Sequence, residues 1–326
     1  MRGLLTAVAI SAACCAGPAA ARVFQPAIVY DVGVEGNPGF NEDARRGVDL
    51  FRHQYGIAAL EYGVGNPTQR EQVFASVARG NADLIVGLGA AQRGALEAAA
   101  RAHPEKKFTL IDAESDLPNV QSLSFRQEEG AYLVGMLAAM ASTNRKIGYI
   151  GGSDIPLVRR IAAGYVAGAR YAEPEIPVLM DMAGSTPAAW QNPTRGAQLA
   201  RSQFGRGADV VFAVAGATGL GALQAAAEGR RLAIGFDADQ DYLYPGTMLT
   251  SLVKRYDVAV YDAFRSALTG TWRSGPRSLG LAEKAVDYTL DDYNDALLTR
   301  PMRDLVEDVR ADIIAGKIKV PDRLQP

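Results

Sequence analysis

Short runs of Val, Ile and Leu alternate with segments of helical periodicity along nearly the whole chain, and this alternation constrains the fold more than any other feature. The sequence predicts strands at 26–31, 57–62, 83–88, 107–112, 119–124, 146–151, 176–181, 209–214, 232–236 and 247–252. It predicts helices between them, near 40–55, 67–79, 92–102, 128–142, 157–171, 194–204 and 219–228. Strands separated by helices of this length form βαβ units, so we expect an α/β protein built on parallel sheets.

The length of 326 residues is sufficient for two domains, each with its own core. The five strands predicted up to about residue 124 suit one doubly wound lobe, and the run that opens at Lys146 starts a second of similar make. The tail differs, with an irregular strand expected at 281–288 and an amphipathic helix at 304–314 that ends before Gly316.

The first 21 residues are typical of a secretory signal peptide. Arg2 precedes an apolar run at 4–16, and the alanines at 19–21 supply a cleavage site, so we expect cleavage after Ala21 and a soluble periplasmic protein. Both cysteines, Cys14 and Cys15, lie inside this leader, which excludes disulfides and a cysteine nucleophile from the mature chain. The alternative is a lipoprotein anchored to the membrane at Cys14 or Cys15.

One stretch near the start of the mature chain carries unusual side chains for a simple turn. The strand that ends at Tyr30 runs into Asp31, a loop rich in Gly and Pro follows, and a helical pattern begins with Phe40 and Asn41. A carboxylate and an amide beside an aromatic ring suit recognition of a flat, polar ring. The same residue types also serve as caps and core, so a purely structural role for all three stays open here.

Three predicted strands end in a carboxylate, at Asp31, Asp112 and Asp237. Because the carboxyl ends of parallel strands converge on the ligand crevice of open α/β sheets, we expect these acids to share one cleft. Lys254 follows another strand and could reach the same cleft, where an ammonium beside Asp237 would grip vicinal hydroxyls. The structural alternatives are helix caps for the acids and a surface position for the lysine.

Signals for catalysis or for a cofactor are weak. The only histidines, His53 and His103, have the surroundings of solvated surface residues. No catalytic Gly-x-Ser-x-Gly motif, zinc-binding His pair, phosphate-binding loop or dinucleotide fingerprint occurs. A net charge of −2 does not favour a nucleic-acid-binding surface. We therefore expect neither an enzyme nor a bound cofactor or metal.

A series of short motifs runs in order along essentially the whole mature chain. These stretches are Asp31-Val-Gly with Gly39-Phe40-Asn41 and Gly47, Phe108 to Asp112, Phe125 with Glu129-Gly130 and Gly135, Ile147 to Gly152, Gly164-Tyr165 with Gly168, Gly207 to Gly221, Ile234 to Gln240, and Thr250-Ser251 with Lys254. Taken together, they resemble the basic membrane protein (BMP) family of ABC-transporter substrate-binding proteins, which includes purine nucleoside receptors.

The family resemblance implies a periplasmic-binding-protein fold of type I, with two Rossmann-like lobes joined by three crossings. By this analogy the N-terminal lobe comprises 22–123 plus 238–252, and the C-terminal lobe comprises 124–237 plus 253–326. The crossings are then expected at strand 119–124, after Asp237, and at strand 247–252.

The resemblance also implies roles for individual residues. By position, Phe40 stacks on a nucleobase, Asn41 and Asp112 bind the base edge, and Asp237 and Lys254 hold the ribose. Phe212 is the candidate for a second stacking ring, and Asp31 orders the loop that carries Phe40. The chain departs from the family pattern in the loop 34–39 and at Trp190, where a smaller ring is common.

The function implied is an exported, monomeric receptor that delivers a purine nucleoside (guanosine, adenosine or inosine) to an ABC permease in the inner membrane. The excess of carboxylates over Lys254 argues independently for an uncharged ligand, because a phosphate would be repelled in a desolvated cleft. The alternatives are a receptor of the same fold for a free nucleobase, a ligand sensor, and a nucleoside hydrolase.

Overall fold

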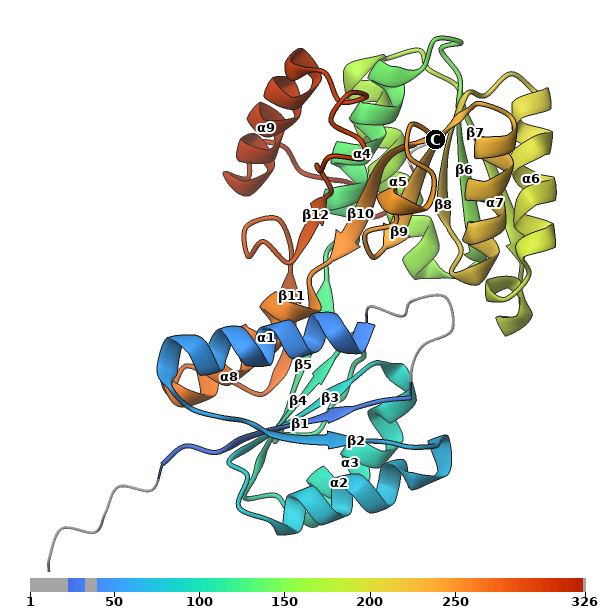
Figure 1. Cartoon of the computed structure of the whole chain (residues 1–326). Helices are drawn as coiled ribbons and strands as arrows, with labels where there is room; N and C mark the ends of the chain where they lie inside the picture. The colour runs from blue at the N-terminus through green and yellow to red at the C-terminus, as the bar shows by residue number, and fades with distance from the viewer. Residues whose placement is uncertain (1–22, 33–39, 325–326) are drawn as a thin grey trace, which may run out of the picture.

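Two six-stranded sheets, each covered by helices, organise the computed structural model, which describes residues 23–32 and 40–324 (Figure 1). The strand order is β11-β5-β4-β3-β1-β2 in the first sheet and β12-β10-β9-β8-β6-β7 in the second. This arrangement confirms the prediction of an α/β protein with two doubly wound lobes. The predicted leader at 1–21, with Cys14 and Cys15, and the loop 34–39 lie outside the described residues.

The first sheet is parallel throughout. Its inner strands β1 and β3 are buried at every residue, as expected for strands with helices on both faces. Helices α1 and α8 cover one face and α2 and α3 the other (Figure 1). The elements of this lobe are β1 (Pro26–Tyr30), α1 (Phe40–Tyr55), β2 (Leu60–Gly63), η1 (Pro67–Gln69), α2 (Arg70–Arg79), β3 (Leu84–Leu88), η2 (Ala90–Gln92), α3 (Arg93–Ala102), β4 (Lys107–Ile111), β5 (Val120–Phe125), α8 (Tyr256–Leu268) and β11 (Gly275–Leu279).

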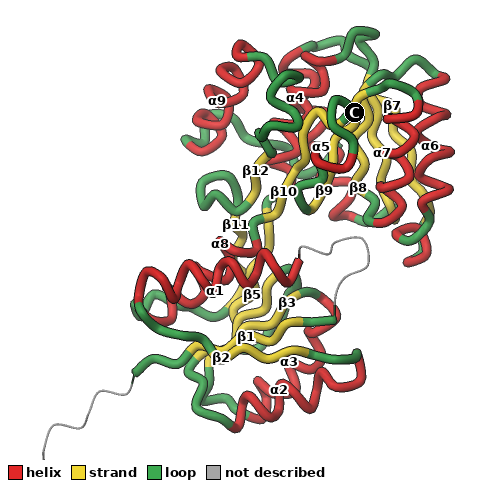
Figure 2. The backbone as a smooth tube through the Cα atoms, viewed as in Figure 1, coloured by secondary structure: helices red, strands yellow, loops and turns green. Residues whose placement is uncertain are grey.

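The second sheet is parallel except for β12, which pairs antiparallel with β10. Helices α6 and α7 lie on one face, and α4 and α5 on the other, with α9 outside α4 (Figures 1 and 2). The elements are α4 (Gln127–Ala141), β6 (Ile147–Ser153), α5 (Pro156–Ala172), β7 (Val178–Gly184), η3 (Pro187–Trp190), α6 (Pro193–Gly205), β8 (Val210–Val214), α7 (Ala217–Glu228), β9 (Leu232–Asp237), η4 (Asp241–Leu243), β10 (Met248–Lys254), β12 (Val286–Tyr288) and α9 (Arg300–Ile314).

The chain crosses between the lobes after β5, after β10 and after β11, which differs from the expected boundaries. The first crossing follows β5, which itself belongs to the first sheet. Residues 238–252 do not join the first lobe, because β10 pairs with β9 in the second sheet. The chain returns to the first lobe only with α8 and β11, and β11 pairs with β5. The chain therefore returns to the first lobe after β10, later in the sequence than the family resemblance predicted.

The three crossings lie side by side and are tied to one another. Arg126, in the first crossing, forms ion pairs with Glu129 at 2.6 Å and with Glu283 of the third at 2.8 Å. The second crossing joins them where the backbone N–H of Arg255 donates to the carbonyl oxygen of Ala285 at 2.9 Å. A waist of three linked connecting segments therefore joins the lobes.

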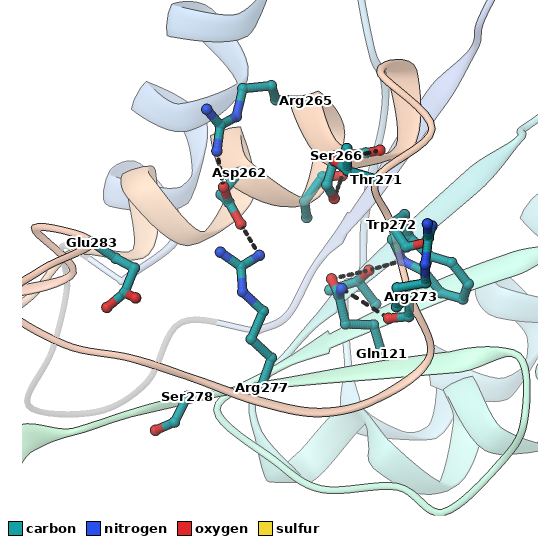
Figure 3. A network of polar contacts seen from close by, with 12 residues as sticks. Gln121, Asp262, Arg265, Ser266, Thr271, Trp272, Arg273, Arg277, Ser278 and Glu283 are labelled. Carbon is teal, nitrogen blue, oxygen red and sulfur yellow. Dashed lines mark hydrogen bonds and ion pairs between the residues drawn. The ribbon is translucent and has the colours of Figure 1, made fainter.

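Polar contacts hold the returning segment against the first lobe (Figure 3). Asp262 of α8 pairs with Arg265 on its own helix and with Arg277 of β11. Between these two elements, the indole N–H of Trp272 donates to Thr109 Oγ1 at 3.0 Å, and the amide of Gln121 donates to the carbonyl oxygen of Arg273 at 2.9 Å. The segment after β10 is thereby integrated into the first lobe.

The predicted strands and helices are present with boundaries shifted by a few residues, except that the strand expected at 281–288 is confined to Val286–Tyr288. Helix α8 was not predicted, although its buried residues Tyr256, Val260, Phe264 and Ala267 recur at helical spacing. No helix in the described ranges is both long and apolar enough to cross a membrane.

Candidate functional site

A cavity of about 340 Å³ lies at the carboxyl ends of the strands of the second sheet. This is where open α/β sheets bind ligands. Its wall is mostly apolar, with a few polar and charged side chains. The lining residues are Gln127, Leu157, Val158, Ile161, Trp190, Gln191, Ala213, Val214, Gly216, Ala217, Gly219, Phe236, Asp237, Gln240 and Lys254.

Lys254 is the link between this cavity and the first lobe. Its ammonium lies 2.7 Å from an oxygen of Asp237, at the end of β9, and 2.8 Å from an oxygen of Asp112, just beyond β4. Burial would lower the pKa of Lys254, but the two carboxylates outweigh it and hold the pKa well above its usual value. Two of the predicted site acids therefore meet at one lysine, with one acid supplied by each lobe.

Asp112 has a second partner that the sequence analysis did not name. Burial would raise the pKa of Asp112, but the ammonium of Lys254 and the hydroxyl of Tyr256, which donates to it at 2.8 Å, hold the pKa below its ordinary value. Tyr256 directly follows the second crossing and is 1 % exposed. Its sequence signal is its place two residues after Lys254, but no element had been assigned there.

Phe40 connects to the same group through an aromatic contact. Its ring meets that of Tyr256 edge to face, with centroids 4.5 Å apart. Phe40, through its contact with Tyr256, and Asp112 and Asp237, through their ion pairs with Lys254, therefore form one connected group. Phe40 does not line the cavity itself and belongs to the facing lobe.

Asn41 presents an acceptor that nothing in the described residues occupies. Its side-chain nitrogen donates to the main-chain oxygen of Asp31 at 2.7 Å, which fixes the orientation of the amide. The other end of the amide, Oδ1, is buried and has no hydrogen-bond partner within 23–32 and 40–324. Because a buried acceptor without a donor is unfavourable, this atom is suited to accept a hydrogen bond from a ligand.

Asp31 is not brought to the other acids. Both of its side-chain oxygens are held by the guanidinium of Arg70, at 2.9 and 3.0 Å. Its contact with the candidate site is the main-chain oxygen that Asn41 binds. Of the three strand-end acids, Asp112 and Asp237 therefore meet at Lys254, and Asp31 does not join them.

Phe212 is placed in the core instead of in the cavity wall. It is 0 % exposed and packs against the rings of Tyr149, Tyr165 and Phe236. The rings that line the cavity are Phe236, from the next strand, and Trp190. Successive side chains of a strand point to opposite faces, and the aromatic signal alone did not distinguish these faces.

Two glycines leave room for the indole of Trp190. A Cβ built on Gly152 would come within 2.8 Å of a ring carbon of Trp190, and one on Gly216 would come within 3.5 Å. The larger ring is thus accommodated by small residues at the ends of β6 and β8. Trp190 therefore lines the cavity, whereas the sequence analysis noted it only as a departure from the family pattern.

A separate acidic cluster lies outside the cavity. Asp239, Asp241 and Asp291 place one carboxylate oxygen each within 4.8 Å of the others, so their geometry could hold a metal ion. However, the oxygens of Asp241 already accept hydrogen bonds from the hydroxyls of Ser251 and Thr289 and from the amide of Asn294. Donors from the chain therefore occupy the central carboxylate.

These features define a class of protein: a two-lobed α/β receptor with a polar and aromatic site where the lobes meet. The family model of the Bmp proteins, described as PnrA-like ABC transporter substrate-binding proteins, matches residues 24–324. The chain belongs to this family, which confirms the resemblance inferred from its motifs.

Individual relatives match over most of their length. The chain is 30% identical to the ABC transporter nucleoside-binding protein BmpA of Lactococcus lactis, covering 91% of this chain and 89% of that protein. It is 32% identical to an uncharacterized lipoprotein of Pyrococcus horikoshii, covering 80% and 68%. A solved ABC-transporter solute-binding protein from Aeropyrum pernix superposes with a TM-score of 0.70 at 28% identity, over 91% of this chain and 94% of that one.

Proposed function

We propose that this protein is the receptor of an ABC importer and binds a purine nucleoside between its lobes. The observation that carries this proposal is the placement of Lys254, whose ammonium is shared by Asp112 of one lobe and Asp237 of the other at the wall of a largely apolar cavity. A carboxylate and an ammonium side by side accept from and donate to the vicinal hydroxyls of a ribose.

The rest of the site suits a flat, uncharged ligand with several hydrogen-bond donors. Trp190 and Phe236 supply aromatic surface in the cavity, and Phe40 supplies it across the cleft, where bases stack with about 1–3 kcal/mol per ring. Asn41 offers a buried acceptor for an N–H group. Two carboxylates against one ammonium leave a negative balance that disfavours a nucleotide phosphate.

The transport role follows from the family and from the two-lobed design. Closure of the lobes on the ligand would create the surface that a permease in the inner membrane recognises. Such a receptor is exported, either free in the periplasm or held by a lipid at Cys14 or Cys15. It works as a monomer, binds its ligand unchanged and catalyses no reaction.

Isothermal titration calorimetry of the purified mature chain tests the ligand class. We expect guanosine, adenosine or inosine to bind with micromolar or tighter affinity, and guanosine monophosphate to give no heat. Lys254→Met should abolish nucleoside binding, because it leaves two carboxylates uncompensated at the site. Lys317→Met, which removes an exposed ammonium, is the matched control.

Other outcomes would redirect the assignment. Binding heat on titration with adenine or guanine, but not with any nucleoside, would indicate a nucleobase receptor. The absence of binding heat with every nucleoside and every base would reject the purine assignment. Release of free base on prolonged incubation would indicate a hydrolase. Tight binding to a membrane kinase domain, with no stimulation of a reconstituted permease, would indicate a ligand sensor.

A further inference from the structure

Gln127 occupies an unusual position at the cavity. It is the first residue of α4, where the chain enters the second lobe, and it lines the cavity together with Asp237 and Lys254. Its side chain is almost completely buried, with the residue 1 % exposed. Its amide oxygen nevertheless has no hydrogen-bond partner anywhere in the described ranges 23–32 and 40–324.

Comparison with another buried glutamine shows what is missing. Gln92, at 0 % exposed, is satisfied at both ends of its amide. Its oxygen accepts from the backbone N–H of Leu88 at 2.7 Å, and its nitrogen donates to the carbonyl oxygen of Val29 at 3.1 Å. Gln240, also at the cavity, uses its oxygen to accept from the N–H of Phe236 at 3.0 Å. Gln127 thus stands apart from both.

A polar group buried without a partner destabilises the fold, and a hydrocarbon side chain of the same size would be more favourable in its place. An unsatisfied amide oxygen at a cavity wall is accounted for if its partner is the molecule that fills the cavity. The oxygen of Gln127 can only accept a hydrogen bond, and the nitrogen can only donate. A ligand hydroxyl can provide both counterparts at once.

The surroundings of Gln127 favour a sugar hydroxyl over a base edge. Phe125 precedes it by two residues, and the ammonium of Lys254 lies 5.8 Å from the centre of that ring. Gln127 lines the cavity together with Asp237 and Lys254. Helix α4 also packs against the strand that ends at Lys254, since a Cβ built on Gly130 would lie 3.3 Å from Leu252 of β10. Gln127 carries no charge, which suits a neutral partner.

We propose that Gln127 is a specificity-determining residue, whose amide binds one ribose hydroxyl of the ligand beside the group held by Asp237 and Lys254. This inference rests on the proposed function, since it names a contact to the nucleoside that the site would hold. It makes Gln127 a residue kept for recognition at the expense of stability.

The test compares Gln127→Leu with the wild-type protein in two measurements. Both proteins are titrated with the nucleoside that binds best and with its 2′-, 3′- and 5′-deoxy analogues. Gln127→Leu should bind the intact nucleoside about tenfold to hundredfold more weakly than the wild type does. One deoxy analogue should bind both proteins equally, because the hydroxyl that Gln127 contacts is already gone. Thermal unfolding without ligand should show an unchanged or higher midpoint for Gln127→Leu.

Gln92→Leu is the matched control, since it makes the same substitution at a buried glutamine whose hydrogen bonds are complete. We expect it to lower the unfolding midpoint and to leave the deoxy-analogue pattern as in the wild type. If no nucleoside binds the wild-type protein, the proposed function fails, and this inference fails with it. If nucleosides bind but Gln127→Leu binds all analogues as the wild type does, or loses affinity equally for every one of them, this inference alone is overturned.

Discussion

At the scale of single residues, the two acids that hold Lys254 share a backbone feature. Asp112 and Asp237 both adopt positive φ values, of 63° and 80°, which side-chain-bearing residues rarely do. Each lies at the carboxyl end of a strand and turns its carboxylate toward the same ammonium. Backbone strain of this kind is concentrated at functional sites, where the surrounding structure maintains it. The two acids thus keep their contacts with Lys254 at the expense of local backbone preference.

A different acid, Asp241, should make stability depend on pH. It is 0 % exposed, and burial raises its pKa to about 7 in spite of the donors around it. Because the folded pKa lies above the ordinary value of 3.8, its contribution to stability is complete below about pH 4 and is lost as the pH rises to about 7. Asp241→Asn, which mimics the protonated acid, should match the wild type at pH 4 and exceed it by a few kcal/mol at pH 8.

Urea unfolding at both pH values would measure this difference. Asp304→Asn changes an acid whose side chain is 70% exposed, so it should alter stability by no more than a few tenths of a kcal/mol at either pH. A wild-type protein that is more stable than Asp241→Asn at pH 8 would contradict the expectation.

At the scale of elements, α4 and α5 form the wall that carries Gln127 and the aliphatic side of the cavity. The helices approach closely because glycines stand at their contact: a Cβ built on Gly135 or Gly164 would fall within 2.2 Å of a carbonyl oxygen of the opposite helix. Gly168 is the tightest, at 1.8 Å from the oxygen of Tyr132. Helix spacing in this lobe therefore depends on the absence of side chains.

Gly168→Ala should accordingly destabilise the protein by at least about 2–3 kcal/mol, because α4 and α5 must separate to admit the methyl group. Gly94→Ala is the matched control, since a Cβ there meets nothing within 4 Å. We expect this control to raise stability by about 0.5 kcal/mol through the lower entropy of the unfolded chain. Chemical denaturation measures both, and equal effects of the two substitutions would refute the close-packing argument.

The sequence was most informative about elements that have a buried, periodic face. The strands from β1 to β10 and the helices from α1 to α7 were found in this way, as were Asp112, Asp237 and Lys254 at strand ends. Strand β11 could not be found, because GPRSL is an edge strand with alternating exposure and a proline. Because β11 and α8 were not predicted, neither the return of the chain to the first lobe nor the position of Tyr256 could be predicted.

The hydrophobic pattern also could not predict which sheet a strand joins or which residues line the cavity. A buried strand such as β10 has the same composition whichever sheet it joins, and only its pairing with β9 decides. Phe212 and Trp190 show the same limit at the site: both are aromatic, but Phe212, in the middle of β8, fills the core, and Trp190, at the end of η3, lines the cavity. Likewise, the lack of a hydrogen-bond partner for the amide oxygen of Gln127 depends on the surrounding structure and cannot be predicted from the sequence.

At the scale of the whole molecule, the candidate site is divided between lobes that only the three crossings join. Residues of the second lobe, Lys254 included, line the cavity, whereas Phe40 and Asn41 begin α1 of the first lobe. Asp112 is tied to Lys254 next to the second crossing, so this contact lies close to any hinge axis. Residues farther from the waist can approach one another by rotation of the lobes, without any change in either core.

Ligand binding should therefore draw the lobes together. In small-angle X-ray scattering, a saturating nucleoside should reduce the radius of gyration of the wild-type protein, because aromatic surface on both lobes is buried only when the cleft closes. Lys254→Met, with its affinity lost, should keep the larger radius at the same nucleoside concentration, and Lys317→Met should close as the wild type does. Calorimetric binding with no change in radius would mean that the ligand is held by the second lobe alone, and Phe40 and Asn41 would then have no part in recognition.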